Sequence, residues 1–109
     1  MASILVVLIS SPASPAGRRA LSMAESLVDQ GHVLTLCCLQ NAVLLAGDRS
    51  PREAGARLDR LLDRGTRCVV LGEDLACRGL TRRERAAAVD YAGIVDLLSA
   101  QHDRVVGAL

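Results

Sequence analysis

Three short, mainly apolar runs, separated by amphipathic stretches, constrain the fold of this chain more than any other feature. The runs are residues 3–9, 32–39 and 68–71. Strands that are apolar along their whole length are typical of parallel sheets, in which helices cover both faces. The stretches between the runs carry apolar residues at helical spacing. The order strand, helix, strand, helix, strand therefore predicts a doubly wound, three-layer α/β fold.

Residues with known capping preferences mark the ends of the expected helices. Ser14 and Pro15 begin the first, because a serine oxygen accepts from open helical N–H groups and proline fits the first helical position. Gly31 ends it, since glycine adopts the left-handed conformation of a C-cap. The capping box of residues 50–53 begins the second helix, and Gly65 ends it. The apolar faces consist of Ala20, Leu21, Ala24, Leu27 and Val28, and of Ala54, Leu58, Leu61 and Leu62.

The last third of the chain is more ambiguous. A capping box at residues 81–84 predicts a helix that runs to Ala100, with an apolar stripe through Tyr91 and Ile94. Alternatively, the helix breaks near Asp90 and restarts, and the periodicity leaves both possibilities open. A short helical turn is expected at residues 41–46 and a last strand at residues 104–106. We expect one domain over residues 1–109, with a mostly parallel sheet of about five strands.

The composition excludes several classes of function. The chain has 109 residues and a net charge of +1, with one Tyr and no Trp or Phe. Aromatic platforms for single-stranded nucleic acid are therefore disfavoured, and no basic patch predicts nucleic-acid binding. All 13 basic residues are Arg. A Schiff-base lysine and a lysine-bearing phosphate loop are thereby excluded.

Cysteine usage and the first apolar run suggest the compartment. The run at residues 3–9 is too short to span a bilayer and has no basic segment before it, so neither a signal peptide nor a membrane anchor is expected. We expect a cytosolic protein whose four cysteines are free thiols. The chain has no Cys-x-x-Cys, and His32 and His102 have no companion at ligand spacing. The loop at residues 10–17 lacks the glycine fingerprint of dinucleotide sites. Neither a metal nor a cofactor is expected.

The segment that follows the third apolar run is the best candidate for chemistry. Gly72 interrupts the run, and Glu73 and Asp74 follow it. Open α/β sheets bind ligands at the carboxyl ends of their strands, and Cys77 is expected just past that edge, in a loop beside a helix N-terminus. The neighbouring Arg78 and Gly79 complete the candidate site. Arg78 would favour the thiolate and the two acids would oppose it. The alternative is a half-buried thiol that only packs.

The other three cysteines have less specific patterns. Cys37 and Cys38 end the second apolar run, so one side chain should face each side of the sheet. Either one could serve as a resolving thiol, although packing is the simpler role. Cys68 lies inside the third run and is expected in the core. The arginines at positions 82, 83 and 85 are most simply a solvated face, and alternatively a docking surface for an acidic partner.

The order of elements and several local motifs resemble the DsrE/DsrF/TusD-like sulfur-relay family over nearly the whole chain. The motifs are Ser10-Ser11, Gly31-His32-Val33, Asn41-Ala-Val43, Arg78-Gly79-Leu80 and Asp103-Arg-Val-Val106. The resemblance implies a small flavodoxin-like domain that assembles into trimers or hexamers. It also implies a cysteine that carries sulfane sulfur as a persulfide and passes it to a partner protein.

The sequence departs from this pattern at the end of the third apolar run. Sulfur-carrying members have their cysteine there, whereas this chain has Leu71 and Gly72. Two hypotheses follow. The chain is a persulfide carrier that uses Cys77 with a sulfur donor or acceptor protein, or it is a non-catalytic scaffold or partner subunit. Both imply a homo-oligomer. A third, weaker reading is a small-molecule-binding module that uses the first loop.

Overall fold

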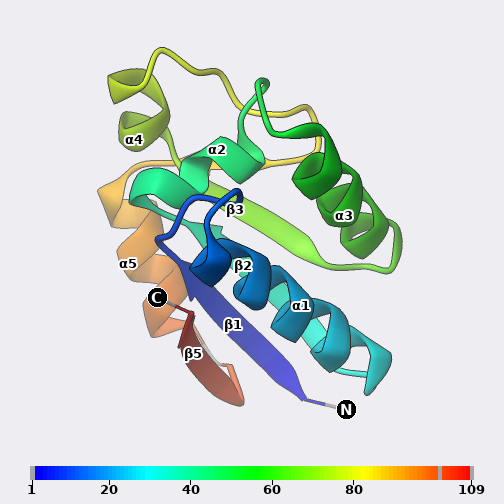
Figure 1. Cartoon of the computed structure of the whole chain (residues 1–109). Coiled ribbons are helices and arrows are strands. Elements are labelled where there is room, and N and C mark those ends of the chain that lie inside the picture. Colours follow the sequence, from blue (N-terminus) through cyan, green and yellow to red (C-terminus); the bar gives the residue numbers. More distant parts are fainter. Residues whose placement is uncertain (1, 101, 109) are drawn as a thin grey trace.

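A computed structural model describes residues 2–100 and 102–108 and shows five parallel strands with helices on both faces (Figure 1). The strand order is β4-β3-β2-β1-β5. The elements in chain order are β1 (Ser3–Leu8), α1 (Pro15–Asp29), β2 (Val33–Cys38), the 3-10 turn η1 (Gln40–Ala42), α2 (Val43–Ala46), α3 (Arg52–Asp63), β3 (Arg67–Leu71), α4 (Gly72–Cys77), β4 (Ala87–Val89), α5 (Tyr91–Ser99) and β5 (Arg104–Ala108). The α/β fold expected from the sequence is confirmed.

The first two strands and the helix between them form as predicted. The Ser14 side chain accepts a hydrogen bond from the Gly17 N–H at 3.0 Å, and Pro15 occupies the first helical position. Gly31 has a φ of 89°, which a residue with a Cβ rarely adopts, and the chain turns there into β2. The expected turn at residues 41–46 is η1 followed by α2. Local sequence is sufficient for this part of the fold.

The predicted capping box at residues 50–53 does not form. Helix α3 begins at Arg52, one residue later than expected, and no side chain caps it. The Ser50 hydroxyl is buried without a hydrogen-bond partner among the described residues. The helix still buries the predicted face, including Ala54, Leu58 and Leu61. Its position is therefore set by this apolar face, and the cap contributes little.

A second expectation was wrong at residues 72–77, where we predicted a loop. Gly72 does end β3, but the chain enters helix α4 at once. Glu73 and Asp74 occupy the first turn of α4, where the positive end of the helix dipole favours acidic side chains. Gly79, with a φ of 65°, follows the end of the helix. The two acids are thus helix-starting residues.

The helix predicted from residue 81 is also absent. Residues 81–86 run in an irregular path past α2 and α3 and lead into β4, a strand that the sequence did not reveal. The Asp48 N–H donates to the Thr81 carbonyl at 2.8 Å, and the Arg83 N–H donates to the Ala46 carbonyl at 2.7 Å. These bonds to the α2–α3 region take backbone groups that a helix would use. Helix α5 starts later, capped by the Asp90 side chain, so the break near Asp90 was the better alternative.

The arginines of this segment are engaged within the molecule. Arg83 forms an ion pair with Asp59 at 2.8 Å, and Arg85 pairs with Asp63 at 2.9 Å. Both acids lie on α3, so the pairs hold the segment against that helix. A Cβ on Gly55 would come within 2.7 Å of the Arg83 guanidinium, so a larger residue at this position of α3 would require the Arg83 side chain to move. Arg82 and Arg85 are exposed, as expected for a solvated face, and Arg83 and Arg85 in addition form surface ion pairs with α3.

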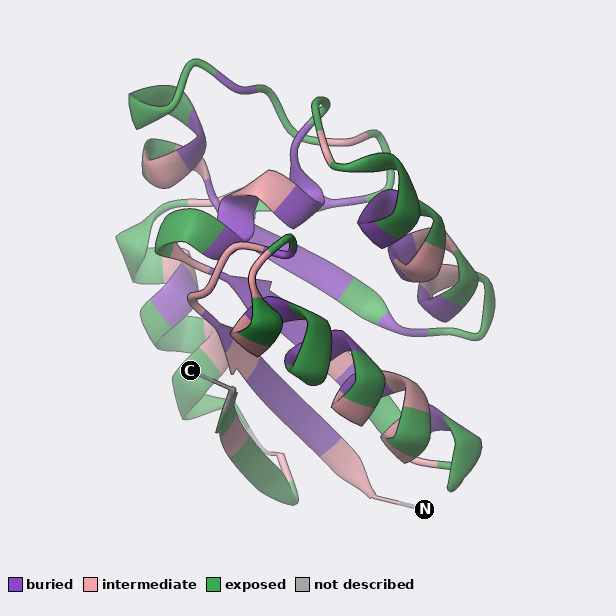
Figure 2. Cartoon of the chain, viewed as in Figure 1, coloured by how far each residue is buried: buried purple, intermediate pink, exposed green. Residues whose placement is uncertain are grey.

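Two hydrophobic clusters lie on opposite faces of the sheet. One face of β1, β2 and β3 packs against α1, α2, α3 and α4, and this cluster contains most of the buried residues (Figure 2). The other face packs against α5 alone. The second cluster consists of Leu5, Cys37, Val69, Leu71 and Ile94, with Val7, Leu39, Val89 and Leu97 partly buried beside them. The two faces are therefore covered very unequally.

Candidate functional site

The carboxyl ends of β2 and β3 bring together the polar residues of the candidate site. Helix α4 follows β3, and η1 follows β2. The Gln40 N–H donates to the Asp74 carboxylate at 2.7 Å, and the Arg78 guanidinium donates to the Asn41 side-chain oxygen at 3.1 Å. Arg78 also lies near Asp74, with a guanidinium–carboxylate distance of 4.0 Å. Two hydrogen bonds thus tie α4 to the turn after the neighbouring strand.

Gln40 has an unusual backbone conformation at this edge. It is the one non-glycine residue with a positive φ, 51°, among the described residues. The left-handed region disfavours side chains with a Cβ, so a compensating contact is needed. The Asp74 carboxylate supplies one by accepting from the Gln40 N–H. Sequence reasoning did not identify Gln40, and its place directly after an apolar run was the available signal.

Leu71 is the residue at which the resemblance to sulfur carriers leads one to expect a cysteine. It is the last residue of β3 and is only 3 % exposed. Its side chain belongs to the second cluster, with Cys37, Val69 and Ile94. This side chain is therefore covered on the α5 side of the sheet. Any group at this position would have little access to a donor protein in this conformation.

Cys77 is the one exposed thiol of the four cysteines. It is the last residue of α4, whereas we expected a loop beside a helix N-terminus. Cys77 is therefore not at the positive N-terminal end of the helix dipole. The hydrogen bonds of Arg78 go to the Asp74 carbonyl and to Asn41. The neighbouring cation is thus engaged elsewhere, and exposure is the main feature that favours a chemical role for Cys77.

The remaining thiols are buried in the sheet. Cys37 lies in the second cluster and Cys38 in the first, so the two side chains face opposite sides as predicted. Burial and the proximity of Cys68 raise the pKa of Cys37 to about 11. A hydrogen bond with Cys68, together with burial, raises the pKa of Cys38. The thiols of Cys37 and Cys38 therefore stay protonated at neutral pH, and protonated thiols are poor nucleophiles.

The candidate site offers acids, an amide, a cation and one accessible thiol. Within residues 2–100 and 102–108, no three potential His, Cys, Asp or Glu ligands come together as a metal site. No helix in the same part of the chain is long and apolar enough to cross a membrane. Glu73 and Gly79 flank the site, and both are exposed. The geometry brings Asp74 and Arg78 within 4.0 Å of each other and adds Gln40 and Asn41 as hydrogen-bond partners.

Comparison with known proteins identifies the family. A family model described as "DsrH like protein" matches residues 13–105. The YchN protein from E. coli has a similar structure, with a TM-score of 0.82 and 17 % identity over 98 % of this chain and 99 % of that chain. MTH1491, a protein of unknown function from Methanobacterium thermoautotrophicum, has a TM-score of 0.72 and 14 % identity over 94 % and 98 %. No curated protein sequence matches the chain.

The two structural likenesses support the fold, and the family model adds the sequence relationship. That model spans nearly all of the chain, from the loop before α1 to the beginning of β5. The family model thus confirms the resemblance to the sulfur-relay family that the sequence motifs indicated. The chain therefore belongs to the DsrH-like family, which is of the sulfur-relay type.

Proposed function

We propose that this chain is a partner or scaffold subunit of a sulfur-relay assembly. The observation that carries the proposal is the place of Leu71, an apolar and buried side chain where the resembled carriers have their thiol. Three of the four cysteines are buried as well. In this proposal the chain has the fold of the family, and Leu71 at the end of β3 contributes to packing where a carrier would have a reactive thiol. The absence of any disulfide among the four cysteines suits the reducing cytosol.

The partner surface in this proposal is the side of the sheet that α5 covers. Tyr91, Val95 and Leu98 are all exposed on α5. Their spacing of four and three residues places them in one stripe along the helix. Val33 and Val105, on the same face of the sheet by strand alternation, are exposed too. Exposed apolar groups in one region mark interaction sites. We propose that copies of this chain associate through this side in a trimer or hexamer.

A second candidate function rests on the exposure of Cys77. In this role its thiolate attacks the outer sulfur of a donor persulfide, and a new S–S bond forms at Cys77. The donor leaves as a thiolate with the electron pair of the broken S–S bond, and the proton from Cys77 passes to water. An acceptor protein then removes the outer sulfur in the same way. Asp74, Arg78 and Asn41 would form the surface around the donor.

Intact mass spectrometry after incubation with glutathione persulfide distinguishes the two functions. The matched control is a synthetic peptide of residues 74–80, which has the same Cys77 neighbours without the fold. A partner subunit should gain one sulfur atom no faster than the peptide. A carrier should gain it at least about tenfold faster, because preorganised sites accelerate such reactions. Loss of the gain in Cys77→Ser would assign the sulfur to that thiol.

A further inference from the structure

A cleft between the first turns of α1 and α3 lies outside the candidate site and has features of a small-ligand site. Its volume is about 150 Å³. Pro12, Leu21, Pro51 and Ala54 form apolar walls, and charged side chains of both helices complete the lining. Helix α1 begins where β1 ends, so the cleft lies toward the carboxyl edge of the sheet. Open α/β folds place many ligand sites at that edge.

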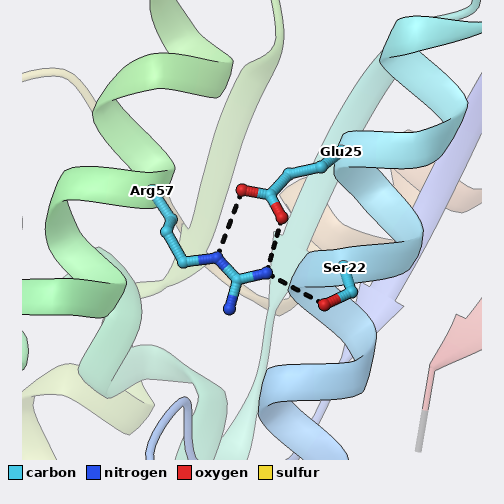
Figure 3. A network of polar contacts seen from close by, with 3 residues as sticks. All are labelled: Ser22, Glu25 and Arg57. Carbon is cyan, nitrogen blue, oxygen red and sulfur yellow. Dashed lines mark hydrogen bonds and ion pairs between the residues drawn. The ribbon is translucent and has the colours of Figure 1, made fainter.

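Arg57 is a preorganised donor in this cleft. Its side chain is only 14 % exposed, and its Nε and Nη2 atoms donate to the two carboxylate oxygens of Glu25 at 3.2 and 2.5 Å. Nη2 also donates to the Ser22 hydroxyl at 3.0 Å. Figure 3 shows that the remaining nitrogen, Nη1, points away from both partners. Because three bonds hold the guanidinium, this N–H pair is presented in one fixed direction.

The charges on the two walls of the cleft are opposite. Glu25 pairs with Arg57, on which the Glu53 carboxylate also acts electrostatically. The two other charged lining residues are Arg18 on α1 and Glu53 on α3. Neither of them forms an ion pair within residues 2–100 and 102–108, and the Arg18 guanidinium donates only to the nearby Ala13 carbonyl, at 3.1 Å. The cleft therefore offers a cation and an acid beside apolar walls, with the Arg57 side chain in its lining. A ligand with a carboxylate and an ammonium group complements this arrangement.

Size limits the ligand further. An engineered apolar cavity of about 150 Å³ holds benzene, which corresponds to about six non-hydrogen atoms. A separate apolar pocket that shares Pro12 and Leu21 with the cleft has a volume of only about 10 Å³. That volume has no room for a branched side chain. The ligand must be compact, with at most a short apolar group toward the floor.

We propose that this cleft binds a small free α-amino acid. The carboxylate lies against Arg18 and the Nη1 of Arg57, and the ammonium group lies against Glu53. The short side chain packs on Leu21 and Ala54. This binding function goes beyond the proposed partner role, and the two can succeed or fail independently. It uses the first loop and the start of α3, far in sequence from Cys77 and α4.

Titration of the full chain with three matched compounds tests the proposal, with backbone amide NMR shifts as the readout. Alanine carries both charges, isobutyrate has a methyl group in place of the ammonium, and isopropylamine lacks the carboxylate. We expect saturable shifts at the Ala13, Arg18 and Ala54 amides with alanine, and binding at least about tenfold weaker with either analogue, as for loss of one charged contact. Equal binding of isobutyrate, or no saturable shift with alanine, would overturn the proposal.

Two substitutions sharpen the test without disturbing the core. Arg18→Gln and Glu53→Gln change exposed lining residues, and each should weaken alanine binding by at least about tenfold. Arg19→Gln is the matched control, because Arg19 is exposed on the same helix and does not line the cleft. Its affinity for alanine should equal that of the parent. Unchanged binding in Arg18→Gln, or an equal loss in Arg19→Gln, would show that the cleft is not the site.

Discussion

The two faces of the sheet differ in how completely helices cover them. On one face α1, α2, α3 and α4 pack together over three strands, and this cluster holds most of the buried side chains (Figure 2). On the other face only α5, nine residues long, covers the strands. The cause is topological. The connections from β1 to β4 pass on one side, and only the return from β4 to β5 passes on the other.

This difference in helix coverage determines on which face apolar side chains remain exposed to solvent. The first face leaves few large apolar side chains in solvent. On the second, Val95 is 59 % exposed, Tyr91 is 58 % exposed and Leu98 is 46 % exposed, all on α5. A lone helix cannot bury a wide apolar surface, so one flank of α5 is left uncovered. Buried apolar residues therefore lie on both sides of the sheet, whereas the large exposed apolar residues lie on the α5 side.

The largest expected effect compares core truncations on the two faces. Leu58 lies on α3 and is fully buried in the first cluster, and Leu58→Ala should cost about 3–5 kcal/mol of unfolding free energy. Ile94→Ala on α5 should cost about 2–3 kcal/mol, because the loosely covered face can relax around the cavity. Urea unfolding measures both. If Ile94→Ala costs as much unfolding free energy as Leu58→Ala or more, the expected difference between the two faces is wrong.

The second prediction uses the buried thiol of the α5 face. Burial raises the pKa of Cys37 from 9.0 to about 11, so the folded state keeps its proton where the unfolded state loses it. The stability from this group is complete below pH 9.0 and is lost as the pH rises toward about 11. The loss is on the order of 3 kcal/mol. Urea unfolding under reducing conditions across this window should show the decline.

Cys37→Ala separates this titration from ordinary alkaline destabilisation. The variant should be less stable than the parent at neutral pH and should have a shallower alkaline decline. Val69→Ala is the control, since Val69 packs in the same cluster and has no proton to lose. It should lower stability by the same amount at every pH. A Cys37→Ala profile parallel to that of the parent would contradict the assignment.

Leu71→Cys tests the strand end at which the resembled carriers have their thiol. Since Leu71 is buried, the smaller side chain should cost about 2 kcal/mol, and the variant should still fold. The new thiol lies under the α5 side, so it should take up sulfur from glutathione persulfide more slowly than Cys77. Intact mass with Cys77→Ser as background measures this. Rapid uptake at position 71 would show that α5 opens and that the second face is an access route.

The smallest effect on stability is expected at the exposed stripe of α5. Val95→Asp should change the unfolding free energy by less than about 0.5 kcal/mol in the monomer, because the side chain is already in solvent. It should nevertheless reduce the mass measured by light scattering from that of an oligomer to that of a monomer. Ala56→Asp adds the same charge to the exposed side of α3 and should leave the oligomer intact. If light scattering shows that the parent protein is a monomer, the proposed trimer or hexamer is wrong.

The candidate site was only partly predictable from the sequence, because some of its contacts join residues that are far apart in the chain. Asp74, Cys77 and Arg78 were identified from their place after an apolar run, and Asp74 and Arg78 do meet at the carboxyl edge. Their partners Gln40 and Asn41 lie more than thirty residues away in the chain and were found only in the structure. The orientation of Arg78 toward Asn41 depends on how β2 and β3 pair. No local pattern contains that information.

The sequence by itself determined the fold class, the first three strands and helices α1 and α3. Apolar runs are stable as strands that are buried between two layers of helices. Ser14 and Pro15 at the start of α1 and Gly31 after its end are local signals that need no distant partner. Tertiary structure decided the path of residues 81–86, because hydrogen bonds from Arg83 and to Thr81 draw that segment onto the α2–α3 region against its helical pattern. The order of the strands in the sheet likewise leaves α5 as the helix that covers the second face. Helix propensity amounts to a fraction of a kcal/mol per residue, so a few well-placed backbone bonds and ion pairs override it.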